Sequence, residues 1–119
     1  MDIDSAGVER LVDAEVSQIS AASLVALIGK LRIQPRLEVR RWNYGAPNEY
    51  PCWLVLVDPS SHVGVAYCAH GFGPKAPWGL LWLSGRRSDM GDDSGWFTSL
   101  ADAVRNGWDI SDRSASHAV

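Results

Sequence analysis

The first third of the chain carries hydrophobic residues at the three- and four-residue spacing of an α-helix. Asp4 or Ser5 can cap the first turn, and Ser20 can cap a second helix that continues the pattern. Pro35 should end the helical region, because proline disfavours helical geometry in the residue before it. We therefore expect helix over residues 5–31, as two short helices or one bent one. The first apolar stripe consists of Val8, Leu11, Val12, Val16 and Ile19.

From residue 36 onward, the spacing of the hydrophobic residues changes to the two-residue alternation of β-strands. Residues 36–43 alternate apolar and charged side chains, which is typical of a half-exposed strand. Residues 51–58 are almost continuously apolar, which favours a central strand covered on both faces. Two further apolar runs, 62–69 and 78–84, each follow a connection rich in turn-forming residues. The sequence thus predicts an antiparallel sheet of about four strands.

A last helix is expected over residues 98–107. Ser99 and Asp102 have the spacing of a capping box, with Asp in place of the usual Glu, and Gly107 supplies a C-terminal stop. Packing this helix and the N-terminal helices on one face of the sheet would bury the apolar surfaces of both. We therefore predict an α+β fold in a single domain that spans residues 1–119.

The register of the two central strands follows from a tight turn. If Asp58 pairs with His62, then Trp53 lies opposite Tyr67, unless a bulge breaks the register. Because side chains alternate between the two faces of a strand, one face of this strand pair then carries smaller side chains than the other. The face with the smaller residues leaves room for the helices, and it carries Leu54, Leu56, Gly64 and Ala66.

The same register places Cys52 opposite Cys68. Such a pair could be half of a metal site or a redox pair, and His62 and His70 are the nearest candidates for further ligands. Structural zinc needs four ligands, and the spacing of these residues matches no zinc motif. We therefore expect two small buried thiols, with no metal and no cofactor.

Cys68 and His70 stand two residues apart, and such a pair could form an activated nucleophile. However, no helix N-terminus clearly follows to lower the pKa of the thiol. We therefore expect no catalytic residues. A small enzyme or a ligand- or metal-binding domain that uses Cys68 and His70 stays an alternative.

Composition narrows the class of protein. The net charge is −3, with 11 basic and 14 acidic residues, which argues against binding to nucleic acid. No apolar run reaches the roughly 18 residues of a membrane span, so no membrane contact is expected. The acidic N-terminus does not resemble a signal peptide, and two cysteines are compatible with a reducing compartment. A cytoplasmic location is the expectation.

The candidate contact residues are acidic and aromatic. The segment around residues 89–93 could meet a basic partner, and large aromatic side chains often anchor protein interfaces. Several of the aromatics lie in or near the Gly- and Pro-rich loop 71–79, which would be a stiff contact loop. The predicted partner-binding residues are Asp89, Asp92, Asp93, Trp96, Trp78 and Phe72.

Three segments carry a resemblance to known proteins: Val-Ala-Tyr-Cys-Ala-His-Gly-Phe-Gly-Pro at 65–74, Pro-Trp-Gly at 77–79 and Gly-Asp-Asp-Ser-Gly-Trp-Phe at 91–97. Together with the size and acidity of the chain, they resemble small bacterial proteins, including the immunity proteins encoded beside polymorphic or contact-dependent toxins. The likeness covers residues 36–107. It implies a cytoplasmic protein that binds and blocks one cognate toxin, often a basic nuclease. That group contains unrelated folds, so no inhibitory residue is transferred by position.

The leading functional hypothesis is therefore a non-catalytic protein-binding domain, specifically an immunity protein that neutralises a toxin by occluding its active site. It would act as a monomer or homodimer. Besides the Cys68 and His70 alternative, a structural or adaptor subunit is possible, in which exposed edge strands extend a sheet between chains.

Overall fold

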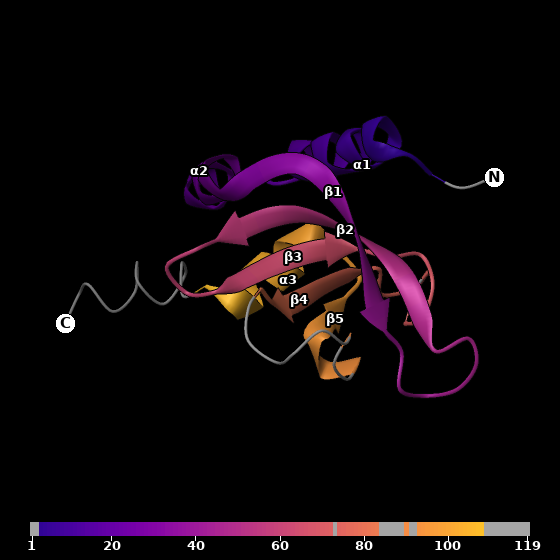
Figure 1. Ribbon diagram of the computed structural model, residues 1–119. Helices are drawn as coiled ribbons and strands as arrows, with labels where there is room; N and C mark the ends of the chain where they lie inside the picture. Colours follow the sequence, from indigo (N-terminus) through magenta and orange to yellow (C-terminus); the bar gives the residue numbers. More distant parts are fainter. Residues whose placement is uncertain (1–2, 73, 84–89, 91–92, 109–119) are drawn as a thin grey trace.

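The computed structural model describes residues 3–72, 74–83, 90 and 93–108. It has an α+β fold in which helices pack on an antiparallel sheet (Figure 1), as the sequence predicted. In chain order the elements are α1 (Ser5–Ser17), α2 (Ala22–Leu31), β1 (Arg32–Arg41), β2 (Glu49–Asp58), β3 (Val63–Tyr67), β4 (Trp78–Trp82), the 3-10 turn η1 (Asp93–Gly95), β5 (Trp96–Phe97) and α3 (Leu100–Gly107).

The sheet is a meander with the strand order β1-β2-β3-β4-β5, and all neighbours are antiparallel. Four of these strands correspond to the four predicted runs. The fifth, β5, has only two residues, too few to show an alternating pattern in the sequence. The prediction of a simple antiparallel meander is confirmed, with one short strand added at its end.

Side-chain caps fix two of the helix starts. The Asp4 side chain accepts a 2.8 Å hydrogen bond from the backbone N–H of Gly7, and the Ser99 hydroxyl accepts one of 3.1 Å from that of Asp102. Both caps were predicted. The predicted Ser20 cap is wrong, because α2 begins one residue later, after Ala21, and has no side-chain cap.

Pro35 lies inside β1 and does not end the helical region. The helix already ends at Leu31, and the strand begins at Arg32, four residues before the predicted start. Pro35 is tolerated because β1 is an edge strand and its pairing with β2 is irregular between Arg32 and Arg36. A proline at such a position removes no ladder hydrogen bond.

The predicted register between β2 and β3 is correct at one end only. Trp53 pairs with Tyr67, as expected, but Asp58 pairs with Val63 rather than with His62. The backbone N–H of His62 instead bonds to the Asp58 carbonyl over 3.0 Å, inside the turn. The register therefore shifts by one residue between the open end and the turn.

The shift is a bulge in β2 between Leu54 and Leu56. The extra residue, Val55, and its neighbour Leu56 both join the core beneath the helices, whereas Leu54 and Val57 belong to the opposite side. The predicted placement of Leu56 beside Leu54 is therefore wrong, because a bulge reverses the alternation of every residue that follows it.

The three helices pack on the other face from the predicted one. They cover Val55, Leu56 and Val65, and not the face of Gly64 and Ala66. The small residues on the face of Gly64 and Ala66 allow other parts of the chain to pack close against the strand. A Cβ at Gly64 would lie 2.6 Å from the Leu56 carbonyl oxygen and 2.8 Å from a methyl group of Leu83.

The sheet curls around a second core on the face away from the helices. The Arg40 guanidinium of β1 reaches the Trp82 carbonyl of β4 over 3.1 Å, although two strands lie between them. Met90 links the two ends of the sheet, because its N–H bonds to Arg41 over 3.0 Å and its carbonyl accepts from the Trp96 indole over 2.7 Å. The buried residues of this core are Cys52, Leu54, Ala66, Cys68, Leu81, Met90 and Trp96.

None of the helices in the described part of the chain is both long enough and apolar enough to cross a bilayer.

Candidate functional site

Two of the predicted contact residues lie in the core. Trp78 is 3% exposed and packs beneath the helices, and Trp96 is 4% exposed and belongs to the second core. The Trp96 ring lies directly against Gly79, where a Cβ would overlap it. In this conformation neither indole is available to anchor a partner.

Phe72 is half-buried in an aromatic cluster between the β1–β2 and β3–β4 connections. Its ring meets Trp42 edge-on at 4.8 Å between centroids, and Tyr44 at 5.8 Å. Gly71, with a φ of +64°, lets the chain turn close under the Trp42 ring, where a Cβ would lie 3.1 Å away. The exposed member of the cluster is Tyr44 rather than Phe72.

The acidic contact residues fall largely outside the described residues. Asp89 and Asp92 are not among them, and Asp93 is the first residue of η1, with a side chain that also lies outside the description. The acidic contact segment therefore stays a prediction.

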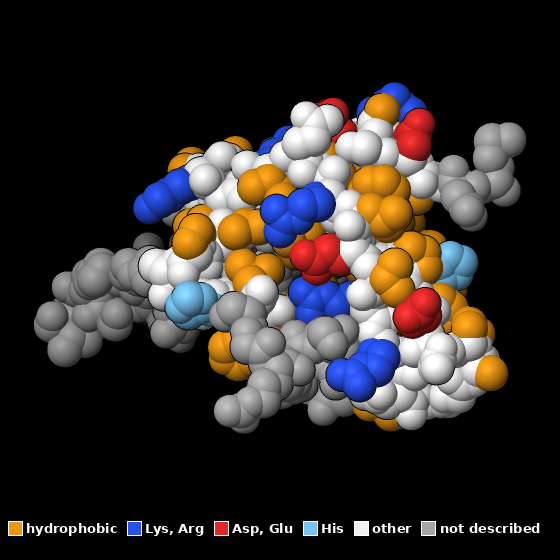
Figure 2. Space-filling model, in the orientation of Figure 1, with side chains coloured by type: hydrophobic (Ala, Val, Ile, Leu, Met, Phe, Trp, Pro, Cys, Tyr) orange, Lys and Arg blue, Asp and Glu red, His pale blue; other side chains and the backbone are white. Residues whose placement is uncertain are grey.

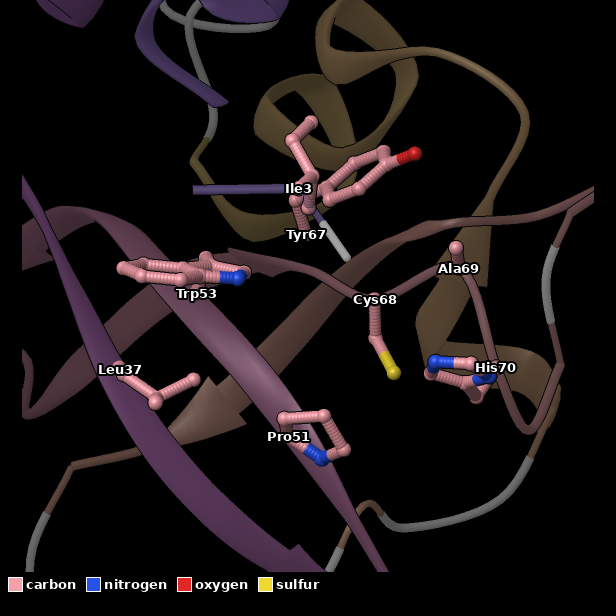
Figure 3. A pocket seen from close by; sticks show the side chains of 8 residues that line it. All are labelled: Ile3, Leu37, Pro51, Trp53, Tyr67, Cys68, Ala69 and His70. Carbon is pink, nitrogen blue, oxygen red and sulfur yellow. The ribbon is translucent and has the colours of Figure 1, made fainter. Parts of the chain in front are cut away.

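A pocket of about 290 Å³ opens beside the middle of β1, the first half of β2 and the end of β3, next to the N-terminal segment. Figure 3 shows its mainly apolar wall, with the Trp53 and Tyr67 rings on one side and the His70 ring on the other. The Cys68 sulfur points toward the space between Pro51 and His70. The residues lining the pocket are Ile3, Leu37, Pro51, Trp53, Tyr67, Cys68, Ala69 and His70.

The structure brings Cys52 and Cys68 together, as the predicted register required. Both are free thiols and both are buried. A hydrogen bond between the two thiols lowers the pKa of Cys68, and the backbone N–H of His70 lowers it further, while burial raises it. The same thiol contact, together with burial, raises the pKa of Cys52 far above its usual range. Cys68 is therefore the more acidic thiol of the pair.

His70 contacts Cys68 through its backbone, and its ring stacks on another residue. The imidazole lies parallel to the Tyr50 ring, at 5.2 Å between centroids and 9° between planes. Cys68 and His70 are thus adjacent, but Cys68 contacts the backbone of His70 and not its imidazole ring. A general base would have to contact the thiol through the ring.

No group of three or more His, Cys, Asp or Glu side chains comes together as metal ligands among the described residues. In that part of the chain the pair of thiols is therefore not completed to a set of three metal ligands.

β1 exposes two apolar side chains and buries one charged side chain. Leu37 and Val39 are 51% and 58% exposed, whereas Arg40 is only 5% exposed. The Arg40 guanidinium donates to the Trp82 carbonyl of β4 and also pairs with Glu38 over 2.8 Å. We call Leu37, Val39 and Pro51, the cross-strand partner of Val39, the β1 apolar face.

The β1 apolar face continues into the pocket, because Leu37 and Pro51 line both. Hydrophobic side chains also reach the surface at several places in the view of Figure 2, interspersed with charged ones. Sequence reasoning found the alternation in β1 but not its direction. Alternation alone does not say which set faces the solvent.

Fold and site together define a small α+β domain with an exposed apolar strand face, an adjoining pocket and a buried thiol pair. In comparisons with protein-family models, with curated proteins and with solved structures, nothing matches this chain.

Proposed function

We propose that this chain is a non-catalytic protein-binding domain, and specifically an immunity protein that neutralises one cognate toxin by occluding its active site. The observation that supports binding is the reversed pattern of β1, in which Leu37 and Val39 point outward while Arg40 is buried. An exposed apolar surface next to a pocket is typical of an interaction site.

The position of β1 in the sheet favours a protein as the partner. β1 is a terminal strand of the meander, and an extended segment of a partner can add to such a strand through main-chain hydrogen bonds. Alternate apolar side chains such as Leu37 and Val39 then supply the side-chain contacts. The pocket beside them, which Ile3 and Trp53 help to line, can take one projecting side chain of the partner.

The toxin class follows from the resemblance of the sequence to immunity proteins and from its charge. With a net charge of −3, the chain would be attracted to a basic nuclease. In this proposal Asp89, Asp92 and Asp93 pair with the cationic groups that hold the phosphates of the substrate. Such contacts would speed association and would weaken as salt is added.

The test is neutralisation in living cells. Each candidate toxin domain, starting with those encoded next to this chain, is expressed with and without it, and growth is measured. Wild-type chain should restore growth, and a Leu37→Asp, Val39→Asp double variant should not. The matched control is Ser23→Asp with Ala26→Asp, which adds the same charge at exposed positions of α2 and should restore growth fully.

A second double variant, Asp92→Lys with Asp93→Lys, tests the acidic contact. Dissociation constants of the purified chain and toxin, measured at low and moderate salt, should rise for this variant at low salt above all. If both double variants bind and neutralise like the wild type, neither surface is the toxin-binding site. If no candidate toxin is neutralised, the immunity function itself is wrong.

A further inference from the structure

Cys52 of β2 and Cys68, the residue that follows β3, stand at positions that suit a disulfide. They lie one residue beyond the cross-strand pair Trp53–Tyr67, and both belong to the buried cluster of the second core. Residues opposite each other in an antiparallel pair have Cα atoms about 4.5–5.5 Å apart, which lies within the range that a disulfide bridges.

The two thiols differ in their access to the pocket. Cys68 lines the pocket, whereas Cys52 is fully buried in the second core and is not among the lining residues. The hydrogen bonds to Cys68 also lower its pKa, which favours the thiolate, the form that reacts with oxidants. One thiol is thus suited to react first and the other to follow.

The pocket sets a limit on the size of the oxidant. Cys68 is only 1% exposed, so an oxidant reaches its sulfur by way of the pocket. The pocket has a volume of about 290 Å³, well above the roughly 10–15 Å³ of such space that one water molecule needs. Small molecules can therefore come near the thiol.

We propose that Cys68 is a site of oxidation by small hydroperoxides, hydrogen peroxide being the simplest, and that Cys52 converts the product to an intramolecular disulfide. The Cys68 thiolate attacks one peroxide oxygen, the O–O bond breaks, and the leaving hydroxide takes up a proton to become water. Cys68 is then a sulfenic acid. The Cys52 sulfur attacks the Cys68 sulfur and displaces hydroxide, which leaves as water with the Cys52 proton.

Overall, one peroxide is reduced to two waters and two thiols are oxidised to one disulfide. In a reducing compartment such a bond would be transient, because cellular thiols would reopen it. Oxidation would tie β2 to the residue that follows β3, directly beside the pocket, since Cys68 is one of the lining residues.

The first experiment uses the reduced, purified wild-type chain and hydrogen peroxide. The expected product is a monomer that has lost two hydrogen atoms and both thiols, and that dithiothreitol restores. Brief oxidation in the presence of dimedone, followed by peptide mapping, should place the adduct on Cys68, on the order of tenfold more often than on Cys52. In urea-unfolded chain this preference should disappear.

Two variants separate the roles. Cys52→Ser should accumulate the dimedone adduct on Cys68, because the second step is blocked, and in Cys68→Ser the remaining Cys52 should stay reduced. The wild-type mapping needs no substitution, so it decides the question even if a variant fails to fold. An adduct on Cys52, an equal reaction of both thiols, or a disulfide between two chains would overturn the proposal. No partner protein is involved, so the result is independent of the toxin-binding test.

Discussion

The Glu15 carboxylate of α1 accepts a 2.9 Å hydrogen bond from the backbone N–H of Leu100, the first residue of α3. The two residues are 85 positions apart. The first N–H groups of a helix have no partner within the helix, and α3 thus obtains one from another helix. Together with the Ser99 cap, this contact fixes where α3 begins and how it meets α1.

Removal of this contact should destabilise the fold. Glu15→Ala leaves the half-buried N–H of Leu100 without its acceptor, so the free energy of unfolding should fall by about 1–2 kcal/mol. Alanine is the better helix former, so a loss cannot come from helix propensity. Urea denaturation of both variants checks this. Glu15→Gln keeps an oxygen acceptor and should recover most of the stability; an equal loss in both variants would contradict the role of the hydrogen bond.

Gly79 should not tolerate a side chain, because Trp96 occupies the space next to it. Gly79→Ala forces the Trp96 ring away from the second core and should destabilise by about 1–3 kcal/mol. The matched control is Gly29→Ala in α2, where a Cβ would meet nothing within 4 Å. That change should be stabilising by up to about 1 kcal/mol, since alanine favours helix. Thermal unfolding of the two variants should shift in opposite directions, and parallel shifts would be inconsistent with this packing.

The Asp58 carboxylate should make the stability of the fold depend on pH. The Trp108 indole donates to its carboxylate over 2.8 Å and the Ser60 hydroxyl over 2.7 Å, and these bonds, the Trp108 bond foremost, hold the pKa of Asp58 well below its usual range. A depressed folded-state pKa gives stability that is present above the unfolded-state pKa of about 3.9. It is lost as pH falls through the lower folded-state pKa.

The corresponding variant is Asp58→Asn, compared with the wild type by thermal unfolding between neutral and acidic pH. The midpoint of Asp58→Asn should be lower at neutral pH, and the gap should close as the wild-type carboxylate becomes protonated. Ser60→Ala, which removes only the hydroxyl donor, should lose less at neutral pH. A gap between wild type and Asp58→Asn that is the same at every pH would show that charge is not involved.

Local signals in the sequence were sufficient to predict most of the helices and strands. The Asp4 and Ser99 caps depend on residues three positions away, so spacing alone predicts them. The apolar runs of β2, β3 and β4 likewise differ plainly from the turns between them. The start of β1 was missed, because Pro35 disfavours helix and is compatible with an edge strand as well.

The candidate site could not be predicted in the same way, because it depends on contacts between residues that are far apart in the sequence. Arg40 turns inward because it meets the carbonyl of Trp82, 42 residues further along the chain, and this turns Leu37 and Val39 outward. Trp78 and Trp96 are large enough to serve equally in a core or at an interface. Only the packing of the sheet decides that both are buried. The pairing of Cys52 with Cys68 could be predicted, since it lies on the side of the bulge where the register held.

The bulge at Val55 divides β2 into two stretches, and the even-numbered residues of the two stretches face opposite sides of the sheet. Before it, the even-numbered Leu54 belongs to the second core; after it, the even-numbered Leu56 lies beneath the helices. Trimming either leucine to alanine would open a cavity of similar size, but on opposite sides of the sheet. A substitution tolerated at one position of this strand therefore says little about the position two residues away, although in an unbroken strand both would face the same neighbours.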